Sequence, residues 1–352
     1  MKTSPLSLAR RGLLAAGLAA TSLFTTLPAQ AQETPVKFQL DWRFEGPSAF
    51  FLWPVAKGHF KAEKLNVTID AGNGSGNAVN RVASGTYDMG FADLSALMEF
   101  HANNPTAPNK PVAVMMVYNN TPAAVFSLKK TGIKTPKDLE GKKLGAPVFD
   151  AGRRAFPIFQ KANGIGNVQW TSMDPPLRET MLARGDVDAI TGFYFTSLLN
   201  LEARNIKAED VAVMMYPDHG VRLYGNVIIA SEDFLKKNPE AVKGFLRAFT
   251  KAAKEVMADP KAATAVVKER DGIINADMEE RRLRLAINSA IATPDARAEG
   301  FGDVKGPRLA LMASQVADAF NTKGRINPDA VWNAGFLPSA AERNVLPPAP
   351  KK

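Results

Sequence analysis

The chain has 352 residues, of which 45% are hydrophobic and 22% charged, the composition of a globular protein large enough for two lobes with separate cores. It contains no cysteine, which excludes disulfides, thiolate catalysis and thiolate metal sites. The net charge of +9 comes from basic residues spread along the chain, without a Lys/Arg-rich block interleaved with aromatic residues. This distribution argues against a nucleic acid partner.

The amino terminus has the pattern of an export signal. Lys2, Arg10 and Arg11 precede an uncharged run over residues 12–26, and a small-x-small cleavage pattern follows at 29–31. The pattern predicts a signal peptide over residues 1–31, and the paired arginines leave both the general secretory and the twin-arginine routes open. No later stretch reaches the roughly 18 to 20 apolar residues of a membrane span.

The stretch 38–60 runs from a strand through a polar and aromatic turn into a helix. The strand is predicted by the period-two alternation of residues 36–40, and the helix by residues 49–57 after a Gly-Pro-Ser turn. Ligands bind beyond the carboxyl ends of strands in open α/β sheets. Trp42, Arg43 and Glu45 are therefore candidate ligand contacts, while packing at the rim of the core is the alternative for Trp42.

A second strand over residues 67–69 leads into a Gly-rich turn that opens a helix near Asn77. Glycines at this junction let the backbone approach a ligand, and Ser75 and Asn77 supply polar groups. A phosphate loop is excluded because the Gly-Lys-Ser/Thr ending is missing. A turn without a ligand role is the alternative.

The next two strands also end in polar residues. The segment 87–93 reads as a strand that ends at Asp93, which is placed to cap the helix behind it or to face a ligand. The apolar run 112–118 is typical of a strand buried on both faces, and it ends at Tyr118. A crossover to a second lobe is expected near Asn120.

The second lobe has its own alternation of strands and helices, with strands at 125–128, 143–146, 168–172, 188–191 and 211–216. Helices are expected at 177–184 and 197–204, and another runs to Ala162. Asp150 opens a helix whose first turn contains Arg153, where a cation opposes the helix dipole unless an anion or carboxylate compensates. Exposure beside an acidic residue is the alternative for Arg153. Tyr194 belongs to an aromatic cluster at a strand end, read as either core or a stacking wall.

The chain returns to the first lobe near Leu223 and then becomes mainly helical, with apolar stripes over 239–257 and 309–320. The pattern predicts an α/β fold with these boundaries: lobe 1 over 32–120 and 223–340, lobe 2 over 121–222, and a tail over 341–352. No cofactor or metal site is expected, because the three histidines lie far apart and no HExxH, HxH or GxSxG motif occurs. The sequence therefore predicts that the chain is not an enzyme.

The order of several short motifs carries a family resemblance. These motifs are LDW, KGHF, KAEKLNVTI, SGTYDMGFAD, TGIKTPKDLEGKKLGAP, ARGDVDAITG and NPEAVKGFLRAF. Together they resemble the periplasmic substrate-binding proteins of ABC importers, in the SsuA/THI5-like branch with an NMT1 domain. That branch includes the binders of sulfonates, nitrate and taurine and of thiamine-pyrimidine precursors.

The resemblance implies a type II periplasmic binding protein fold, with two lobes joined by two crossover strands and a ligand in the interlobe cleft. It places ligand contacts on the loops that hold Trp42, Ser75, Asn77, Asp93, Tyr118, Asp150, Arg153 and Tyr194. Residues 43–47 depart from the pyrimidine binders, which continue from LDW with a proline-asparagine stretch and a histidine. A related eukaryotic synthase uses a cysteine-rich loop and consumes its own histidine, so this cysteine-free chain resembles the transport protein.

The resulting expectation is a monomeric protein that captures a small molecule in the periplasm and delivers it to an ABC transporter permease with a cytoplasmic ATPase. The expected ligand is a planar organic anion, such as an aromatic carboxylate or sulfonate, stacked between Trp42 and Tyr194 and neutralised by Arg43 or Arg153. A thiamine-pyrimidine precursor, read through its amino groups by Glu45 or Asp93, or a taurine-like compound is the alternative. A solute-sensing module for a membrane receptor is the alternative from another class.

Overall fold

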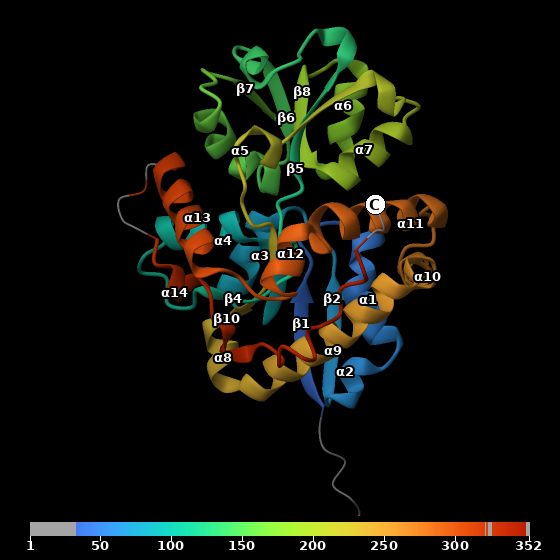
Figure 1. Cartoon of the computed structure of the whole chain (residues 1–352), viewed down its shortest axis with the longest axis vertical. Helices are drawn as coiled ribbons and strands as arrows, with labels where there is room; N and C mark the ends of the chain where they lie inside the picture. Colours follow the sequence, from blue (N-terminus) through green and yellow to red (C-terminus); the bar gives the residue numbers. More distant parts are fainter. Residues whose placement is uncertain (1–32, 321, 323–325, 350–352) are drawn as a thin grey trace, which may run out of the picture. The chain divides into compact units, whose positions relative to one another are not determined.

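A computed structural model describes residues 33–320, 322 and 326–349 of the chain. The predicted export signal over residues 1–31 lies outside the described residues. Two mixed sheets of five strands each organise the described part (Figure 1). We call the sheet with β1 and its helices lobe 1, and the sheet with β5 and its helices lobe 2.

The lobe 1 sheet has the strand order β2-β1-β3-β10-β4. Its strands are β1 (Thr34–Gln39), β2 (Leu65–Asp70), β3 (Met89–Asp93), β4 (Pro111–Met116) and β10 (Asn226–Ser231). β1 pairs in parallel with β2 and β3, whereas β10 runs antiparallel to β3 and β4. The carboxyl ends of β1, β2 and β3 consequently meet at one edge, where ligands bind in open α/β sheets.

The lobe 2 sheet has the strand order β7-β6-β8-β5-β9. Its strands are β5 (Ala123–Leu128), β6 (Lys143–Ala146), β7 (Gln169–Ser172), β8 (Ala189–Phe193) and β9 (Val211–Met215). β6 is parallel to β7 and β8, and β5 is antiparallel to β8 and β9. β5 is buried along its whole length, which explains its continuous apolar sequence.

The chain passes between the two sheets twice. The first passage connects β4 to β5 and the second connects β9 to β10. Arg308 holds both passages together: it donates hydrogen bonds to the carbonyl oxygen of Asn119 at 2.8 Å and the side-chain oxygen of Asn120 at 2.7 Å. Its guanidinium also lies 3.9 Å from the ring centroid of Tyr224 on the second passage.

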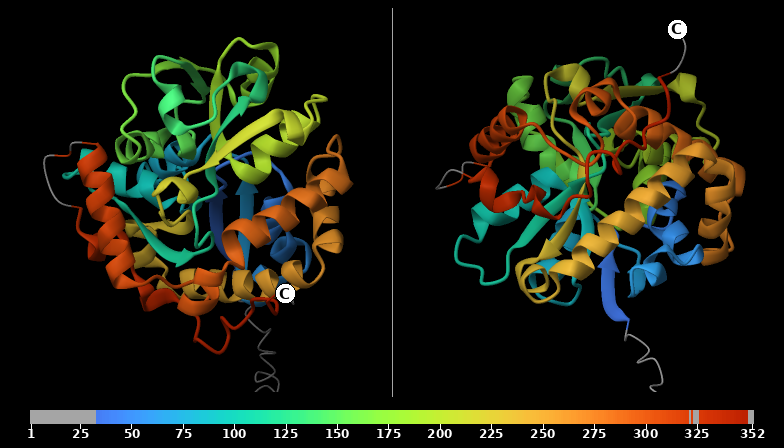
Figure 2. Two further views of the ribbon diagram at one scale, coloured as in Figure 1. Left: turned by 45° about the horizontal axis from the view of Figure 1, so that its top comes forward. Right: turned by 60° about the horizontal axis from the view of Figure 1, so that its bottom comes forward.

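The helices of lobe 1 are α1 (Ala49–Ala56), α2 (His59–Ala62), α3 (Ser75–Ala83), α4 (Leu94–Asn103), α8 (Glu232–Lys237), α9 (Pro239–Ala258), α10 (Pro260–Arg270), α11 (Ala276–Ala286), α12 (Pro294–Glu299), α13 (Gly306–Ala319) and α14 (Pro328–Val331). The helices of lobe 2 are α5 (Ala151–Ala162), α6 (Arg178–Arg184) and α7 (Tyr194–Glu202). Figure 2 shows the carboxyl-terminal helices, in orange and red, beside the blue and teal elements of lobe 1. None of the helices in the described residues is long and apolar enough to cross a membrane.

Aromatic side chains pack α1 and α9 onto the lobe 1 sheet. The ring of Phe38 on β1 stacks on Phe245 of α9 at 5.1 Å between centroids and lies 4.9 Å from Phe51 of α1. All three side chains are buried. The apolar stripe on α9 is therefore a packing face, as its helical spacing indicates.

Many element boundaries differ by up to three residues from the sequence-based expectation. The strand expected from Tyr87 begins at Met89, and the carboxylate of Asp88 directly before it accepts a hydrogen bond from the backbone N–H of Lys37 at 2.8 Å. The helix expected from Ser197 begins at Tyr194, whose backbone N–H donates to the carbonyl of Pro122 at 2.8 Å. The aromatic cluster therefore spans the end of β8 and the first turn of α7.

Candidate functional site

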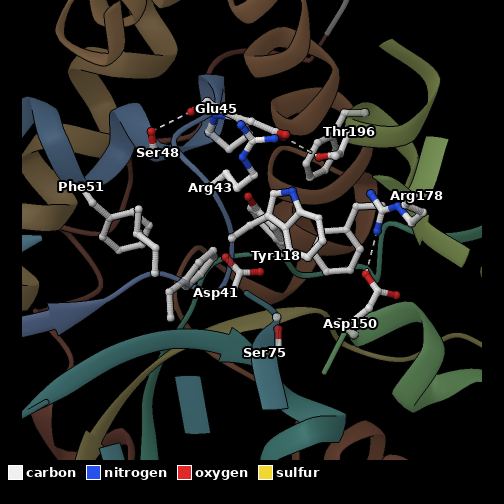
Figure 3. A pocket seen from close by; sticks show the side chains of 18 residues that line it. Asp41, Arg43, Glu45, Ser48, Phe51, Ser75, Tyr118, Asp150, Arg178 and Thr196 are labelled. Atoms are coloured by element: carbon white, nitrogen blue, oxygen red, sulfur yellow. Dashed lines mark hydrogen bonds and ion pairs between the residues drawn. The ribbon is translucent and has the colours of Figure 1, made fainter. Parts of the chain in front are cut away.

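A pocket lies between the two lobes, at the carboxyl ends of β1, β4, β6 and β8. It encloses about 550 Å³ of space, part of which is open to solvent. Lobe 1 contributes Asp41, Trp42, Arg43, Glu45, Pro47, Ser48, Phe51, Gly74, Ser75 and Tyr118, and lobe 2 contributes Asp150, Ala151, Arg178, Phe193, Phe195 and Thr196. Figure 3 shows many of these side chains gathered round the pocket.

The turn between β2 and α3 brings the lobes close together at one side of the pocket. Gly74 has a φ of +126°, and a Cβ atom there would stand 2.2 Å from the carbonyl oxygen of Phe149 in lobe 2. Two residues later, the backbone N–H of Gly76 donates a hydrogen bond to the same carbonyl oxygen of Phe149 at 3.2 Å. Glycine is required at position 74 by both the conformation and the close approach.

Aromatic rings form the apolar walls. Tyr118 is buried and packs edge-on against Phe91 at 5.2 Å and Phe195 at 5.8 Å between ring centroids. Burial raises the pKa of the Tyr118 phenol well above its ordinary value, and the carboxyl groups of Asp41 and Glu45 add to the rise. Tyr118 is therefore a neutral group in the pocket wall.

Asp41 places a carboxyl group in the pocket without a cation beside it. One oxygen accepts a hydrogen bond from the side-chain nitrogen of Asn226 at 2.7 Å, and among the described residues Asp41 has no ion-pair partner. Burial raises the pKa of Asp41 to about 7, against the hydrogen bond from Asn226, which lowers it. The neighbouring carboxyl groups of Asp93 and Glu45 raise it further.

Glu45 connects the two lobes across the pocket. Its Oε2 atom accepts a hydrogen bond from the hydroxyl of Thr196 at 2.8 Å and lies 3.6 Å from Nη1 of Arg282 (Figure 3 shows the Thr196 contact). Burial raises the pKa of Glu45, while Arg282 opposes the rise and the nearby Glu279 adds to it. Glu45 is a second buried acceptor at the pocket, partly neutralised by Arg282.

Arg178 is the buried cation of the pocket, and its charge is already compensated. Its Nη1 atom donates to Asp150 Oδ2 at 2.9 Å, and its Nε atom donates to Glu179 Oε1 at 2.8 Å. All three side chains are buried. Arg43, the other cation in the lining, is exposed at the rim. The interior of the pocket therefore carries more carboxyl groups than free cations.

Six of the ten residues proposed from the sequence as ligand contacts line this pocket: Trp42, Arg43, Glu45, Ser75, Tyr118 and Asp150. The other four, Asn77, Asp93, Arg153 and Tyr194, are not part of its lining. The assignment of all ten as ligand contacts stays a prediction.

Asp93 caps α4 and lies directly behind the pocket. Its carboxylate accepts hydrogen bonds from the backbone N–H of Ser95 at 2.8 Å and from the Ser95 hydroxyl. Its own backbone N–H donates to the hydroxyl of Ser75, a lining residue, at 2.9 Å. Burial raises the pKa of Asp93 to about 6, against the hydrogen bonds from Ser95.

Arg153 and Tyr194 are directed elsewhere. Arg153 donates to the carbonyl of Ala146 at 2.8 Å and to the hydroxyl of Ser172 at 3.0 Å, and its guanidinium lies 4.7 Å from the Trp170 ring centroid. Tyr194 is half-buried and packs against a hydrophobic cluster of lobe 2 that includes Phe126 and Leu201. Asn77 lies in the first turn of α3, where its backbone N–H donates to the carbonyl of Gly74.

Sequence reasoning missed most of the other lining residues, among them Asp41, Arg178, Phe193 and Thr196. Asp41 could have been found, because it lies between the first strand and Trp42 in the same loop. Phe193 precedes Tyr194 in the aromatic cluster that was recognised, and Thr196 follows that cluster directly. Arg178 had no signal, because only the folded lobe places the start of α6 beside Asp150.

Metal binding has no candidate cluster in the described ranges. No group of three or more His, Asp or Glu side chains there is arranged to hold a metal ion. The histidines are engaged in other contacts: His59 with Glu255 at 2.7 Å and His101 with the carbonyl of Pro111 at 2.8 Å.

Comparison with known proteins gives a family and a fold. The model of the family described as "NMT1/THI5 like" matches residues 48–263. A 4-amino-5-hydroxymethyl-2-methylpyrimidine phosphate synthase of Aspergillus parasiticus is 28% identical over 239 residues, which cover 65% of this chain and 68% of the synthase. The riboflavin-binding protein RibY of Chloroflexus aurantiacus is 26% identical over 212 residues, 59% of this chain and 58% of RibY.

Among solved structures, the alkanesulfonate-binding protein SsuA of Xanthomonas axonopodis pv. citri, bound to MOPS, matches with a TM-score of 0.67. The match covers 86% of this chain and 99% of SsuA at 13% identity. At this identity the likeness establishes the fold. It confirms the two-lobed α/β fold of periplasmic binding proteins that the sequence motifs predicted.

The comparisons overturn one expectation. The sequence predicted that the chain is not an enzyme, because no catalytic motif was recognised. That prediction is wrong: several curated relatives, each 28% identical to the chain, are named as 4-amino-5-hydroxymethyl-2-methylpyrimidine phosphate synthases.

Proposed function

Because this chain belongs to the NMT1/THI5-like family, we propose that it captures a planar heterocycle with amino groups, of the aminopyrimidine class, in the pocket between its lobes. The pocket is of a kind suited to such a molecule, since it combines aromatic walls with a few polar groups that fix orientation. Trp42 and Tyr118 supply apolar surface for a flat ring. Stacking of this kind contributes on the order of 1 kcal/mol beyond area burial.

The observation that carries the proposal is the uncompensated carboxyl group of Asp41 in the lining. One of its oxygens is occupied by Asn226, which leaves the other to accept a hydrogen bond from an amino group. A buried acceptor without a partner costs free energy, so a ligand that donates to it gains that free energy on binding. Glu45 offers a second acceptor in the same pocket.

The carboxyl groups of the pocket lining also disfavour an anionic ligand. Arg178 is neutralised by Asp150 and Glu179, and Arg153 lies outside the lining. A carboxylate or sulfonate in the pocket would meet Asp41 and Glu45, and a like charge at close range in a buried site is unfavourable. The geometry therefore favours the pyrimidine alternative over the aromatic anion.

The proposed biological role is capture and delivery. We propose that the chain is exported to the periplasm, acts there as a monomer, and presents its ligand to an ABC transporter permease driven by a cytoplasmic ATPase. Support comes from the fold that it shares with the SsuA protein and from the interlobe position of the pocket. Closure of two lobes on a ligand is a hinge motion that such a delivery cycle uses.

A second candidate function is formation of a phosphorylated pyrimidine by the chain itself. The names of the relatives with 28% identity favour it. Both candidates use the same pocket and the same class of molecule, so a binding measurement alone does not separate them.

The test is a thermal-shift and calorimetry screen of the mature chain, refolded from denaturant to remove any bound molecule. The probes are 4-amino-5-hydroxymethyl-2-methylpyrimidine, benzoate, benzenesulfonate, taurine and nitrate. We expect the pyrimidine at about 100 times its dissociation constant to stabilise the protein by about 2.7 kcal/mol, with no shift for the anions. Stabilisation by benzoate or benzenesulfonate and not by the pyrimidine would refute the proposed ligand class.

Mass spectrometry of the released molecule separates the two candidates. Recovery of the unaltered pyrimidine in a 1:1 ratio after prolonged incubation supports capture. Appearance of a phosphorylated pyrimidine when the isolated chain is incubated with a phosphorylated precursor of the ring, and without added pyrimidine, supports the second candidate and refutes capture as the function.

A further inference from the structure

Arg178 contacts a side chain of the opposite lobe in addition to its ion pairs. Its guanidinium carbon lies 4.8 Å from the ring centroid of Trp42, which belongs to lobe 1, whereas Arg178 begins α6 of lobe 2. Arg178 is only 1% exposed. The contact is therefore a buried cation–π interaction that joins the lobes at the pocket.

Lobe 2 holds this guanidinium in place from several sides. Asp150 and Glu179 bind its edges, at 2.9 Å and 2.8 Å. Ser197 in turn donates to Glu179 at 2.8 Å. Because the carboxylates occupy the edge N–H groups, a flat face of the guanidinium remains for an aromatic ring.

The backbone of lobe 2 also makes room for the guanidinium. A Cβ atom at Gly192 would stand 2.9 Å from the Cζ atom of Arg178 and 2.3 Å from the hydroxyl of Ser197. Gly192 lies on β8, immediately before the pocket-lining Phe193. A side chain at this position would displace Arg178 from its place beside the pocket.

Trp42 has little else to fix the orientation of its ring. Its indole N–H makes no hydrogen bond to another described residue, and its side chain is only half-buried in the loop after β1. A free aromatic side chain in a loop samples several rotamers. Contact with Arg178 selects one of them when the lobes are together.

We propose that Arg178 is a positioning residue that fixes the Trp42 indole as the stacking wall of the pocket, so that affinity for a planar ligand depends on Arg178 through Trp42. This inference rests on the proposed function for the choice of ligand. The contact itself also predicts a spectroscopic property of the ligand-free protein, which does not depend on what the pocket binds.

The first experiment is a double-mutant cycle with calorimetric titration of 4-amino-5-hydroxymethyl-2-methylpyrimidine. Arg178→Met is made together with Glu179→Gln, which keeps the net charge, and is compared with Glu179→Gln alone. We expect the loss of Arg178 to weaken binding about tenfold when Trp42 is present and less than twofold in a Trp42→Leu background. An equal loss in both backgrounds would overturn the proposal, since Arg178 would then act independently of Trp42.

A matched control is provided by Arg153, which lies over Trp170 at 4.7 Å, nearly the same distance, but outside the pocket lining. Arg153→Met removes an arginine–tryptophan contact in the same lobe. We expect its affinity to remain within twofold of the unmodified chain. A tenfold loss here would show that removing any such contact weakens binding through the fold, and would overturn the specific role of Arg178.

The second experiment uses the ligand-free protein. The emission contributed by Trp42 is obtained by subtracting the spectrum of Trp42→Leu from that of the parent. We expect this contribution to shift to longer wavelength and to become more accessible to acrylamide when Arg178 is replaced in the charge-balanced variant. An unchanged Trp42 contribution would refute the positioning role, whereas failure of the pyrimidine to bind with the spectral change present would refute only the proposed ligand.

Discussion

Asp41 lies in the pocket lining, where burial disfavours the charged form of its carboxyl group. Its carboxyl group lines the pocket, and burial raises its pKa from 3.8 to about 7. A raised pKa means that the folded chain holds this proton more tightly than the unfolded chain does. The stabilising contribution of Asp41 is therefore fully present below about pH 4 and is lost as the pH rises through about 7.

The raised pKa of Asp41 predicts how the stability of Asp41→Asn depends on pH. The amide cannot ionise, so the variant escapes the cost of a buried charge while keeping a hydrogen-bonding group beside Asn226. We expect the variant to melt at least about 3 °C higher than the unmodified chain at pH 8, and at nearly the same temperature at pH 4. Thermal unfolding monitored by circular dichroism across this pH range measures both values.

Asp70→Asn serves as the control, because Asp70 ends β2, lies outside the pocket and accepts a hydrogen bond from the Tyr87 hydroxyl at 3.0 Å. We expect no pH-dependent gain for it. A gain for Asp41→Asn that is as large at pH 4 as at pH 8 would mean that ionisation of Asp41 is not its source.

The sequence placed Trp42 and Glu45 in a loop that lines the pocket, while their contact with a ligand stays a prediction. Trp42 and Glu45 follow the first strand in the same loop, and the position of a strand end is readable from a period of two. Arg178 shows the limit of this reading. It lies 136 positions after Trp42 in the sequence, and their contact requires two lobes to fold and meet.

At the scale of elements, α11 is one of the helices of lobe 1 that contact lobe 2. Arg282 on α11 donates hydrogen bonds to the carbonyl oxygens of Phe195 at 3.0 Å and Thr196 at 2.9 Å. The same side chain pairs with Glu279 at 2.9 Å and is only 1% exposed. These contacts join the lobes at the backbone of Phe195 and Thr196, two residues that line the pocket.

Loss of this connection should favour separation of the lobes. We expect Arg282→Met to increase the radius of gyration measured by small-angle X-ray scattering and to weaken ligand binding. It should also lower the free energy of unfolding by about 3 kcal/mol, because carboxylates remain buried without their cation. Scattering with calorimetry on one sample gives all three values.

Arg284→Met is the matched control on the same helix. Arg284 pairs with Glu280 at 2.7 Å on the exposed face and makes no contact with lobe 2 among the described residues. Its radius of gyration and affinity should not change. If Arg282→Met also left both values unchanged, the contacts of Arg282 would have no part in holding the lobes together.

The sequence predicted most elements because their patterns are local. The strand at 143–146 and the helix that ends at Ala162 agree with β6 and α5. The start of α7 was missed, since the aromatic residues before Ser197 fit a strand by propensity, whereas the backbone is helical from Tyr194.

At the scale of the whole molecule, the order of weak motifs identified the two-lobed fold, which the structural likeness confirms. The ligand class was harder to predict, because it depends on which charges are compensated after folding. Arg153 and Asp150 are close in sequence, yet Arg153 is directed to Ala146 and Ser172, while Asp150 pairs with Arg178. The arginines in the sequence led to the prediction of an anionic ligand. In the fold, Arg153 lies outside the pocket and Arg178 is paired with Asp150, so the pocket is acidic.

The most direct test of this account is the affinity of 4-amino-5-hydroxymethyl-2-methylpyrimidine for Asp41→Ala, measured by calorimetry beside Asp70→Ala. Loss of a hydrogen bond to a charged group costs about 1.5 to 3 kcal/mol, so we expect Asp41→Ala to bind at least about tenfold more weakly. Asp70→Ala should bind within twofold of the unmodified chain. Equal affinity of Asp41→Ala and the unmodified chain for the pyrimidine would contradict the account.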